Sequence, residues 1–169
     1  MHQVHGPDVV VVTEPGQHAG VDADAAVTTV PGARLAVRTA DCVPIVLHRD
    51  GAVAVVHAGW RGLASGVVAA ALDAMGGATH AVLGPHIRRG CYEFGPADLD
   101  EVASALGDGV RSTTTWGTPA LDLTAAARAA LVDLSVSDAG ACTACTDLYY
   151  SWRARQEMAR FATIAWLEP

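Results

Sequence analysis

Short apolar and β-branched runs alternate along the chain with segments in which apolar residues recur every three or four positions. The short runs predict strands at residues 9–13, 25–30, 35–48, 52–57, 81–84 and 160–167. The helical spacing predicts helices at residues 63–75, 96–106 and 123–134, with Gly76-Gly77 ending the first and Pro96 opening the second. Because no linker or repeat interrupts this order, we expect one α/β or α+β domain over residues 1–169, layered around a mixed sheet.

The strongest local signal is Asp50-Gly51, which lies between two apolar runs and predicts a two-residue hairpin turn. In that hairpin Pro44 faces His57, and the alternation of side chains places Cys42 on the same face as His57. Diagonal neighbours of this kind have backbones roughly 7–8 Å apart. A zinc ion, with bonds of about 2.0–2.3 Å to nitrogen and sulfur, would bridge them. The opposite face of the hairpin is also apolar, so we expect both faces to be covered.

A purely structural interpretation of this pair stays open, since cysteine is often a small core residue and a core histidine can be satisfied by hydrogen bonds. The surroundings favour a site instead. Asp41 precedes the cysteine, and Gly59-Trp60-Arg61-Gly62 follows the histidine where the chain turns into a helix. Polar residues and glycines at strand ends are more typical of a site than of a core.

Composition limits the class of protein and its partners. The chain has 169 residues, of which 51% are hydrophobic and 17% charged, which is enough for one substantial core. The net charge of −7 and the absence of a basic run argue against a nucleic-acid partner. No apolar stretch approaches the roughly 18 residues of a membrane span, and no secretory signal is visible. The irregular spacing of four cysteines favours a reduced, cytoplasmic protein.

Two further motifs carry possible chemistry. The glycine-containing loop 59–62 leads into the predicted helix, whose free N–H groups together with Arg61 suggest a phosphate site, although a solvated Arg61 is an equal alternative. Cys142-Thr143-Ala144-Cys145 is a C-x-x-C motif that fits half of a zinc site, a redox pair or two unrelated thiols. No second C-x-x-C is present, so a structural zinc is not expected. Surface or structural roles are expected for His18, His48, His80 and His86.

An ordered series of motifs covers essentially the whole chain. These are Gln3-Val4-His5-Gly6, Thr39-Ala40-Asp41-Cys42-Val43-Pro44, Val56-His57-Ala58-Gly59-Trp60-Arg61-Gly62, Gly84-Pro85-His86-Ile87, Cys91-Tyr92-Glu93, Leu121-Asp122-Leu123, Cys142-Thr143 and Tyr149-Tyr150-Ser151-Trp152-Arg153. The series resembles the YfiH/YlmD family, variously described as laccase-like polyphenol oxidases, purine nucleoside phosphorylases and peptidoglycan-editing factors.

The resemblance implies a cytoplasmic protein with an α-β-β-α layered fold of the YfiH/CNF1-like type. It also implies a zinc site held by His5, Cys42 and His57, with copper as the alternative metal. Three ligands with one open position are typical of a catalytic zinc. Cys42, His57, Asp41 and Arg61 are the expected catalytic residues. Gln3, Arg61 and Arg153 are expected to bind substrate.

Several functions follow as hypotheses. The first is a zinc enzyme that phosphorolyses adenosine, inosine, guanosine or methylthioadenosine and deaminates adenosine, as the resemblance implies. The second is copper-dependent oxidation of phenols, although a multicopper centre needs more clustered histidines than the seven present. The third is metal-free hydrolysis with Cys42 as nucleophile and His57 as base. The fourth is a catalytically impaired binding or peptidoglycan-editing protein.

The chain departs from the family pattern at both ends. Family members usually carry several dozen residues before the first motif, so we expect a shortened member or a truncated chain. Near the C-terminus the family tends to show two adjacent arginines and a Gly-Arg. This chain has Arg153-Ala154-Arg155 and Ala159-Arg160 instead.

Overall fold

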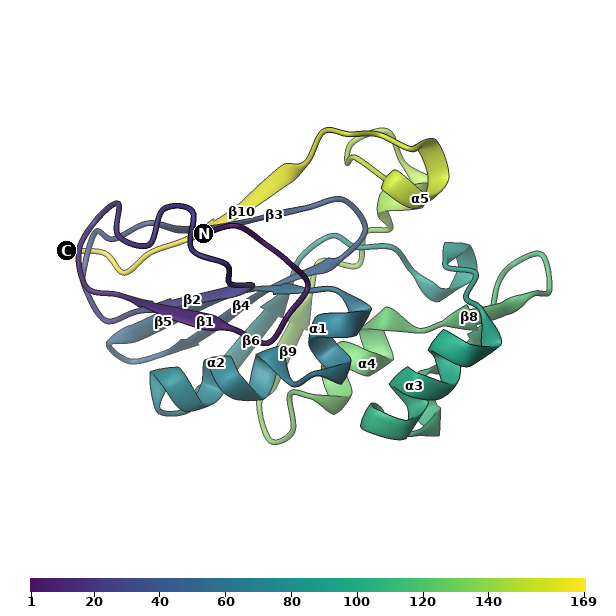
Figure 1. Ribbon diagram of the computed structural model, residues 1–169, viewed down its shortest axis with the longest axis horizontal. Coiled ribbons are helices and arrows are strands. Elements are labelled where there is room, and N and C mark those ends of the chain that lie inside the picture. Colours follow the sequence, from purple (N-terminus) through teal and green to yellow (C-terminus); the bar gives the residue numbers. More distant parts are fainter.

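A six-stranded mixed sheet forms the centre of the computed structural model, which describes residues 1–169 (Figure 1). In spatial order it contains β1 (Val9–Val12), β2 (Ala25–Thr28), β5 (Ala52–Ala58), β4 (Val43–Arg49), β6 (His80–Leu83) and β9 (Ser135–Asp138). The outer pairs β1–β2 and β6–β9 are parallel, whereas the inner pairs are antiparallel. The predicted mixed sheet is therefore confirmed.

Helices cover one face of this sheet, and a second, two-stranded sheet lies over the other face (Figure 1). The helices on that face are α1 (Trp60–Ala64), α2 (Val67–Met75) and α4 (Leu123–Ala129). Helix α3 (Pro96–Leu106) packs on α1 and α4, and the short helix α5 (Trp152–Arg155) lies on the side of the second sheet. The second sheet pairs β3 (Leu35–Thr39) with β10 (Phe161–Ala165), and β7 (Arg111–Thr113) with β8 (Pro119–Leu121) makes a further hairpin. The predicted layered α/β architecture is thus present. None of the helices is long or apolar enough to cross a membrane.

The hairpin predicted at Asp50-Gly51 is confirmed, with Arg49 opposite Ala52 and Pro44 opposite His57. All residues of β5 are buried, because one face of the strand meets the helices and the other meets the β3–β10 sheet. The expected cover on both faces is therefore confirmed. A strand packed on both sides is a rigid support for the residues at its end.

The prediction of one strand over residues 35–48 was wrong. The chain forms two strands, β3 and β4, and they belong to different sheets. Asp41, in the link between them, has a φ of 87°, a left-handed conformation that aspartate tolerates better than most residues. The chain reverses there and leaves one layer for the other. The apolar residues of β3 pack into one core cluster, whereas Val43, Ile45 and Leu47 of β4 pack into the other.

The prediction of one helix over residues 63–75 was also wrong. Helix α1 begins at Trp60, and Gly66, with a φ of 89°, separates it from α2. The helix predicted at 123–134 ends at Ala129, and the unpredicted edge strand β9 follows. Strand β9 has no apolar run, since its sequence is Ser-Val-Ser-Asp with a single apolar residue. The strands at the other predicted positions and the helix Pro96–Leu106 are confirmed.

Candidate active site

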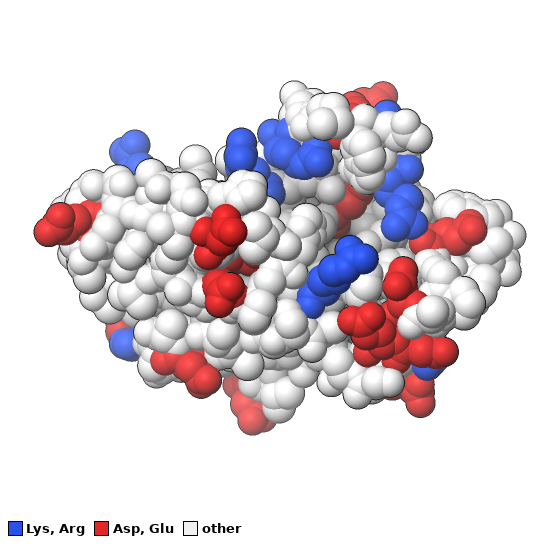
Figure 2. All heavy atoms as spheres, viewed as in Figure 1, with Lys and Arg blue, Asp and Glu red and all other residues white.

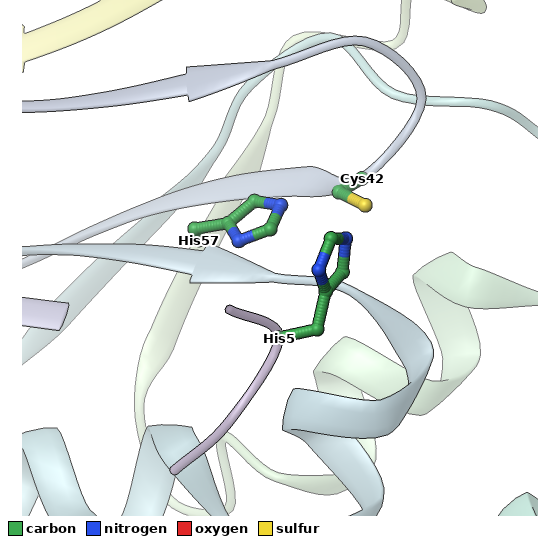
Figure 3. Close-up of side chains that lie close together, drawn as sticks. All are labelled: His5, Cys42 and His57. Atoms are coloured by element: carbon green, nitrogen blue, oxygen red, sulfur yellow. The ribbon is translucent and has the colours of Figure 1, made fainter. Parts of the chain in front are cut away.

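Three segments that are distant in sequence bring His5, Cys42 and His57 together (Figure 3). Their ligand atoms all lie within 4.8 Å of one another, and the two imidazole rings meet edge to face with centroids 4.7 Å apart. Cys42 stands on the link between β3 and β4, and His57 stands near the end of β5. His5 comes from the loop before β1 and has a φ of 63°. The arrangement gives two nitrogen donors and one sulfur donor at one point.

Asp24 is the main residue of this site that the sequence analysis missed. It is fully buried, and its Oδ1 atom lies 2.7 Å from Nδ1 of His57. The same carboxylate accepts the backbone N–H groups of Val4, His5 and Gly6 at 2.8–3.0 Å. It therefore orients the ring of His57, and it also fixes the loop that carries His5. No local motif marks Asp24, since Asp22 is a neighbouring exposed aspartate in a similar context.

The charges of these groups support one another. Burial raises the pKa of Cys42, but hydrogen bonds and charges from His5 and His57 outweigh it and bring that pKa down to about 7. Burial lowers the pKa of His57, but the hydrogen bonds to Asp24 and Cys42 outweigh it and raise that pKa to about 9. The pKa of Asp24 lies below its usual value because hydrogen bonds, chiefly from His57, overcome its burial. The site therefore favours a thiolate, which is the form of cysteine that binds metals.

Gly59 allows the three groups to approach. A Cβ atom at this position would lie 2.8 Å from Cδ2 of His5 and 3.2 Å from Sγ of Cys42. No side chain fits there without displacing His5. Two nitrogens and one sulfur, with one side left open by a glycine, form a donor set that fits zinc or copper.

A cavity of about 650 Å³ opens beside the three groups. Four of the eleven arginines of this acidic protein line it, namely Arg38, Arg61, Arg153 and Arg160. Figure 2 shows arginine side chains gathered around a hollow on this face of the molecule. Because the net charge is −7, this concentration of positive charge makes the cavity a local attractor for anions.

Gln3 and Asp41 both line this cavity, yet their polar atoms are already engaged. The amide of Gln3 donates to the carbonyl of Arg38 and accepts its N–H, at 2.8 and 2.9 Å. The buried carboxylate of Asp41 accepts the Thr143 hydroxyl and the backbone N–H of Arg153, both at 2.7 Å. Each residue therefore ties two segments of the cavity wall together.

Arg61 and Arg153 also line the cavity, and each packs against an aromatic ring. The Arg61 guanidinium lies 4.2 Å from the centre of the Trp60 ring, and that of Arg153 lies 4.7 Å from the Tyr92 ring. The idea of a helix N-terminus near Leu63 beside Arg61 was wrong, since α1 begins at Trp60 and is five residues long. The positive charge of the cavity comes from the arginine side chains themselves.

Thr39 is a second residue that the sequence analysis did not single out. It is only 1% exposed, and its hydroxyl has no hydrogen-bond partner within the chain. Thr39 belongs to the lining of the same cavity. A buried hydroxyl without a partner is costly unless something else satisfies it. Thr39 therefore carries an unsatisfied, buried hydroxyl within the cavity wall.

The histidines that were expected to be structural or superficial lie away from this site. His86 is fully buried, bonded to the Gly84 carbonyl and the Thr124 hydroxyl, and burial lowers its pKa to about 4. His48 and His80 stack on each other at the surface, with ring centroids 4.8 Å apart. The structural and surface roles expected for these residues are confirmed.

Comparisons with known proteins agree on one relationship. A family described as multi-copper polyphenol oxidoreductase laccase matches residues 1–168. A purine nucleoside phosphorylase of Streptomyces griseus is 42% identical over 99% of this chain and 73% of its own length. A purine nucleoside phosphorylase of Mycobacterium tuberculosis strain H37Rv is 41% identical over 99% of this chain and 71% of its own length.

Solved structures give the same picture. The crystal structure of a Neisseria meningitidis protein matches with a TM-score of 0.87 and 32% identity, over 99% of this chain and 73% of that one. YlmD from Geobacillus stearothermophilus matches with a TM-score of 0.84 and 28% identity, over 99% of this chain and 72% of that one. YfiH from Bacillus licheniformis matches with a TM-score of 0.86 and 25% identity, over 98% and 72%.

Proposed function

The chain belongs to the YfiH/YlmD family, described as multi-copper polyphenol oxidoreductase laccase, and from this membership we propose that it is a metal-dependent enzyme acting on purine nucleosides. The observation that carries the proposal is the set of His5, Cys42 and His57 beside a cavity lined by arginines. The names of relatives more than 40% identical to the chain, which are purine nucleoside phosphorylases, support the substrate class.

The proposed reactions are phosphorolysis of adenosine, inosine, guanosine or methylthioadenosine, and deamination of adenosine. Phosphorolysis transfers the pentose from the base to phosphate and releases the free base. Deamination replaces the 6-amino group with oxygen from water and releases ammonia. Phosphorolysis needs a site that holds a nucleoside beside the phosphate anion, and deamination needs one that holds a nucleoside beside an activated water. We propose that residues 1–169 carry this activity as one domain.

His5, Cys42 and His57 are the proposed metal ligands, and zinc is the proposed ion. When bound, such an ion acts as a Lewis acid and activates water or a substrate oxygen at neutral pH. Asp24 acts through His57, because its hydrogen bond to Nδ1 selects the tautomer whose Nε2 faces the site. Asp41 holds Thr143 and the backbone of Arg153 in the cavity wall, which makes it a positioning residue in this proposal.

The arginines supply the proposed phosphate site. The guanidinium groups of Arg61 and Arg153 each lie on an aromatic ring of the cavity wall, so part of their conformational freedom is already lost. A guanidinium binds phosphate through two parallel hydrogen bonds. Gln3, proposed to help bind substrate, lies in the same wall, where its amide bonds the backbone of Arg38 and so holds that segment in place.

The test is product analysis with zinc-loaded protein and adenosine, with and without phosphate. Adenine that forms only with phosphate identifies phosphorolysis, and inosine in either condition identifies deamination. Cys42→Ala should abolish both products, since it removes one of the three proposed ligands. If neither product forms while one zinc per chain is bound at this site, the enzyme proposal fails and the binding or peptidoglycan-editing alternative takes its place.

The phosphate site has its own experiment. Arg61→Ala should raise the phosphate concentration needed for half-maximal phosphorolysis by about tenfold or more, because one charge-assisted contact is lost. Arg128→Ala is the matched control, since Arg128 is exposed on α4 and does not line the cavity. A phosphate dependence that is the same in both variants would exclude Arg61 from the site.

Copper-dependent oxidation of phenols is the second candidate function, because the family description names it and a His₂Cys donor set also suits copper. It ranks lower because multicopper oxidation needs several clustered histidines, and here the cluster contains His5 and His57 alone among seven histidines. Oxygen consumption with a phenol at one copper per chain would place it first. Activity that survives removal of all metal would instead favour the thiol mechanism of Cys42 and His57.

A further inference from the structure

A second cluster of possible ligands lies outside the proposed active site. The sulfur atoms of Cys91, Cys142 and Cys145 all lie within 4.8 Å of one another, and those of Cys91 and Cys145 are 3.2 Å apart. Cys91 ends the 3₁₀ turn Arg89–Cys91, while Cys142 and Cys145 flank and end the turn Thr143–Cys145. All three thiols are free. They are the remaining cysteines of the chain after Cys42.

Contacts of the residues just before each turn hold the two turns together. His86 and Cys142 form a parallel bridge, and the N–H of Arg88 donates to the Cys142 sulfur at 3.4 Å. The Arg88 guanidinium is fixed in turn by a two-pronged ion pair with Asp138. The three sulfurs therefore converge because of the fold, and one of them already receives a hydrogen bond that stabilises its thiolate form.

Three sulfur donors without a carboxylate or imidazole in the group select soft metal ions. Around an ion with metal–sulfur bonds of about 2.3 Å, the sulfurs of a three-thiolate site lie about 3.8–4.0 Å apart. The Cys91–Cys145 separation of 3.2 Å is shorter than that value, and the other two separations are at most 4.8 Å, so we expect a rotation of the exposed Cys145 side chain to bring the sulfurs to it. That exposure also gives an ion access from solvent and leaves a fourth position open.

We propose that Cys91, Cys142 and Cys145 form a second metal site, which binds one thiophilic ion, Zn²⁺ or Cu⁺, through three thiolates. Binding forms three metal–sulfur bonds and releases the thiol protons to solvent, with no change of oxidation state. The C-x-x-C motif lacks a partner motif in the sequence, and Cys91 supplies the missing ligand from 54 residues away.

The proposed site borders the cavity of the active site through two short links. Thr143, which lies between the two cysteines of the motif, donates its hydroxyl to Asp41 next to Cys42. Tyr92, which follows Cys91, lines the arginine-rich cavity. A neighbouring cavity of about 770 Å³ is lined by Cys91 and also by Arg153, which lines both cavities. A bound ion would therefore clamp two segments of the active-site wall to each other.

Cobalt(II) titration of reduced, metal-free protein tests the proposal, with Cys42→Ala as background so that the first site does not contribute. One equivalent of Co²⁺ should bind and give the sulfur-to-cobalt charge-transfer absorption of three thiolates. Zn²⁺ and Cu⁺, added separately, should each displace it. Cys145→Ser in the same background should remove one third of that absorption and weaken Co²⁺ binding at least tenfold. Because Cys145 is exposed, this variant should fold normally, which circular dichroism checks.

Two outcomes would overturn the proposal. One is that the Cys42→Ala protein, kept reduced, binds no Co²⁺ while the wild type binds one equivalent. The other is that Cys145→Ser leaves both absorption and affinity unchanged. Protein purified without reductant can carry a disulfide between Cys91 and Cys145, which mass spectrometry detects as a loss of two hydrogens. If this protein binds Co²⁺ after reduction, the result supports the site. The same disulfide in protein that stays unable to bind Co²⁺ after reduction counts against it.

Discussion

The protein contains two clusters of metal-ligating groups, each with its ligand atoms within 4.8 Å of one another, but the two have different supports. In the first cluster, Cys42 and His57 stand at the ends of the largely buried strands β4 and β5, and His5 stands on the loop that Asp24 holds. The cluster of Cys91, Cys142 and Cys145 stands on two 3₁₀ turns, and Cys145 is exposed. The comparison shows that similar distances between ligands arise from a rigid sheet in one region and from loop packing in the other.

The two clusters also differ in the residues that hydrogen-bond to their ligands. The first has Asp24, a buried carboxylate that orients His57 and holds the loop of His5. In the second, Cys142 accepts one backbone N–H from Arg88. A preorganised ligand set beside an arginine-lined cavity suits catalysis, since the open position faces bound reactants. A sulfur-only set at the surface suits a clamp between two segments.

The largest effect should come from His57→Ala. Removal of one of three ligands should weaken metal binding at the first cluster by more than about a hundredfold. This exceeds the loss of affinity that follows when only a residue hydrogen-bonded to a ligand is changed. The second cluster should still bind, because its ligands are the thiols of Cys91, Cys142 and Cys145, which stand on other segments than β5. Zinc titration with a chromophoric chelator measures both. If binding at the two clusters fell together, the distinction between them would be lost.

Asp24→Asn should weaken zinc binding at the first cluster by about 10–100-fold. A neutral amide does not supply the negative charge that makes His57 a stronger ligand, and it orients the ring less firmly. The substitution also sets an NH₂ group against backbone donors, so thermal stability should fall. Asp22→Asn is the matched control, since Asp22 is exposed and bonds only the surface residue His2. Equal zinc affinity in both variants would show that the carboxylate has no role in orienting the ligand.

Gly59→Ala should disturb the first cluster without affecting the second. The new Cβ would lie 2.8 Å from Cδ2 of His5, so that ring must move, and zinc affinity should fall by about tenfold. Gly95→Ala is the control, because a Cβ atom there meets nothing within 4 Å. Competition with a chelator gives the affinities of both variants. An unchanged affinity in Gly59→Ala would mean that His5 is not held in place by its neighbours.

The smallest effect should come from Thr143→Val, which breaks the hydrogen bond between the two regions. Loss of the hydroxyl leaves one oxygen of Asp41 without its buried donor and should reduce the free energy of unfolding by about 1–3 kcal/mol. Thr29→Val, at an exposed position, should change stability little. Urea denaturation measures the difference. Equal stability of the two variants would show that the link carries no energy.

Local signals in the sequence predicted much of the first cluster. Asp50-Gly51 is a turn whose backbone angles depend on its own residues, and the alternation of side chains then places Cys42 beside His57. His5 came only from the resemblance to a family, since nothing local indicates that the N-terminal loop reaches the end of β5. Pro96 similarly marks the start of α3 through its own fixed backbone angle.

Tertiary structure alone decided the rest. The sequence does not show that Asp41 reverses the chain between two sheets, that Asp24 rather than Asp22 is buried behind His57, or that Cys91 meets Cys145. Each of these depends on contacts between segments that are distant in sequence. The two cysteines are 54 residues apart, and Asp41 is held by Thr143, which is 102 residues away. A turn is encoded by the angles its own residues prefer, whereas such contacts exist only after the layers have packed, because burial of the whole core brings them together.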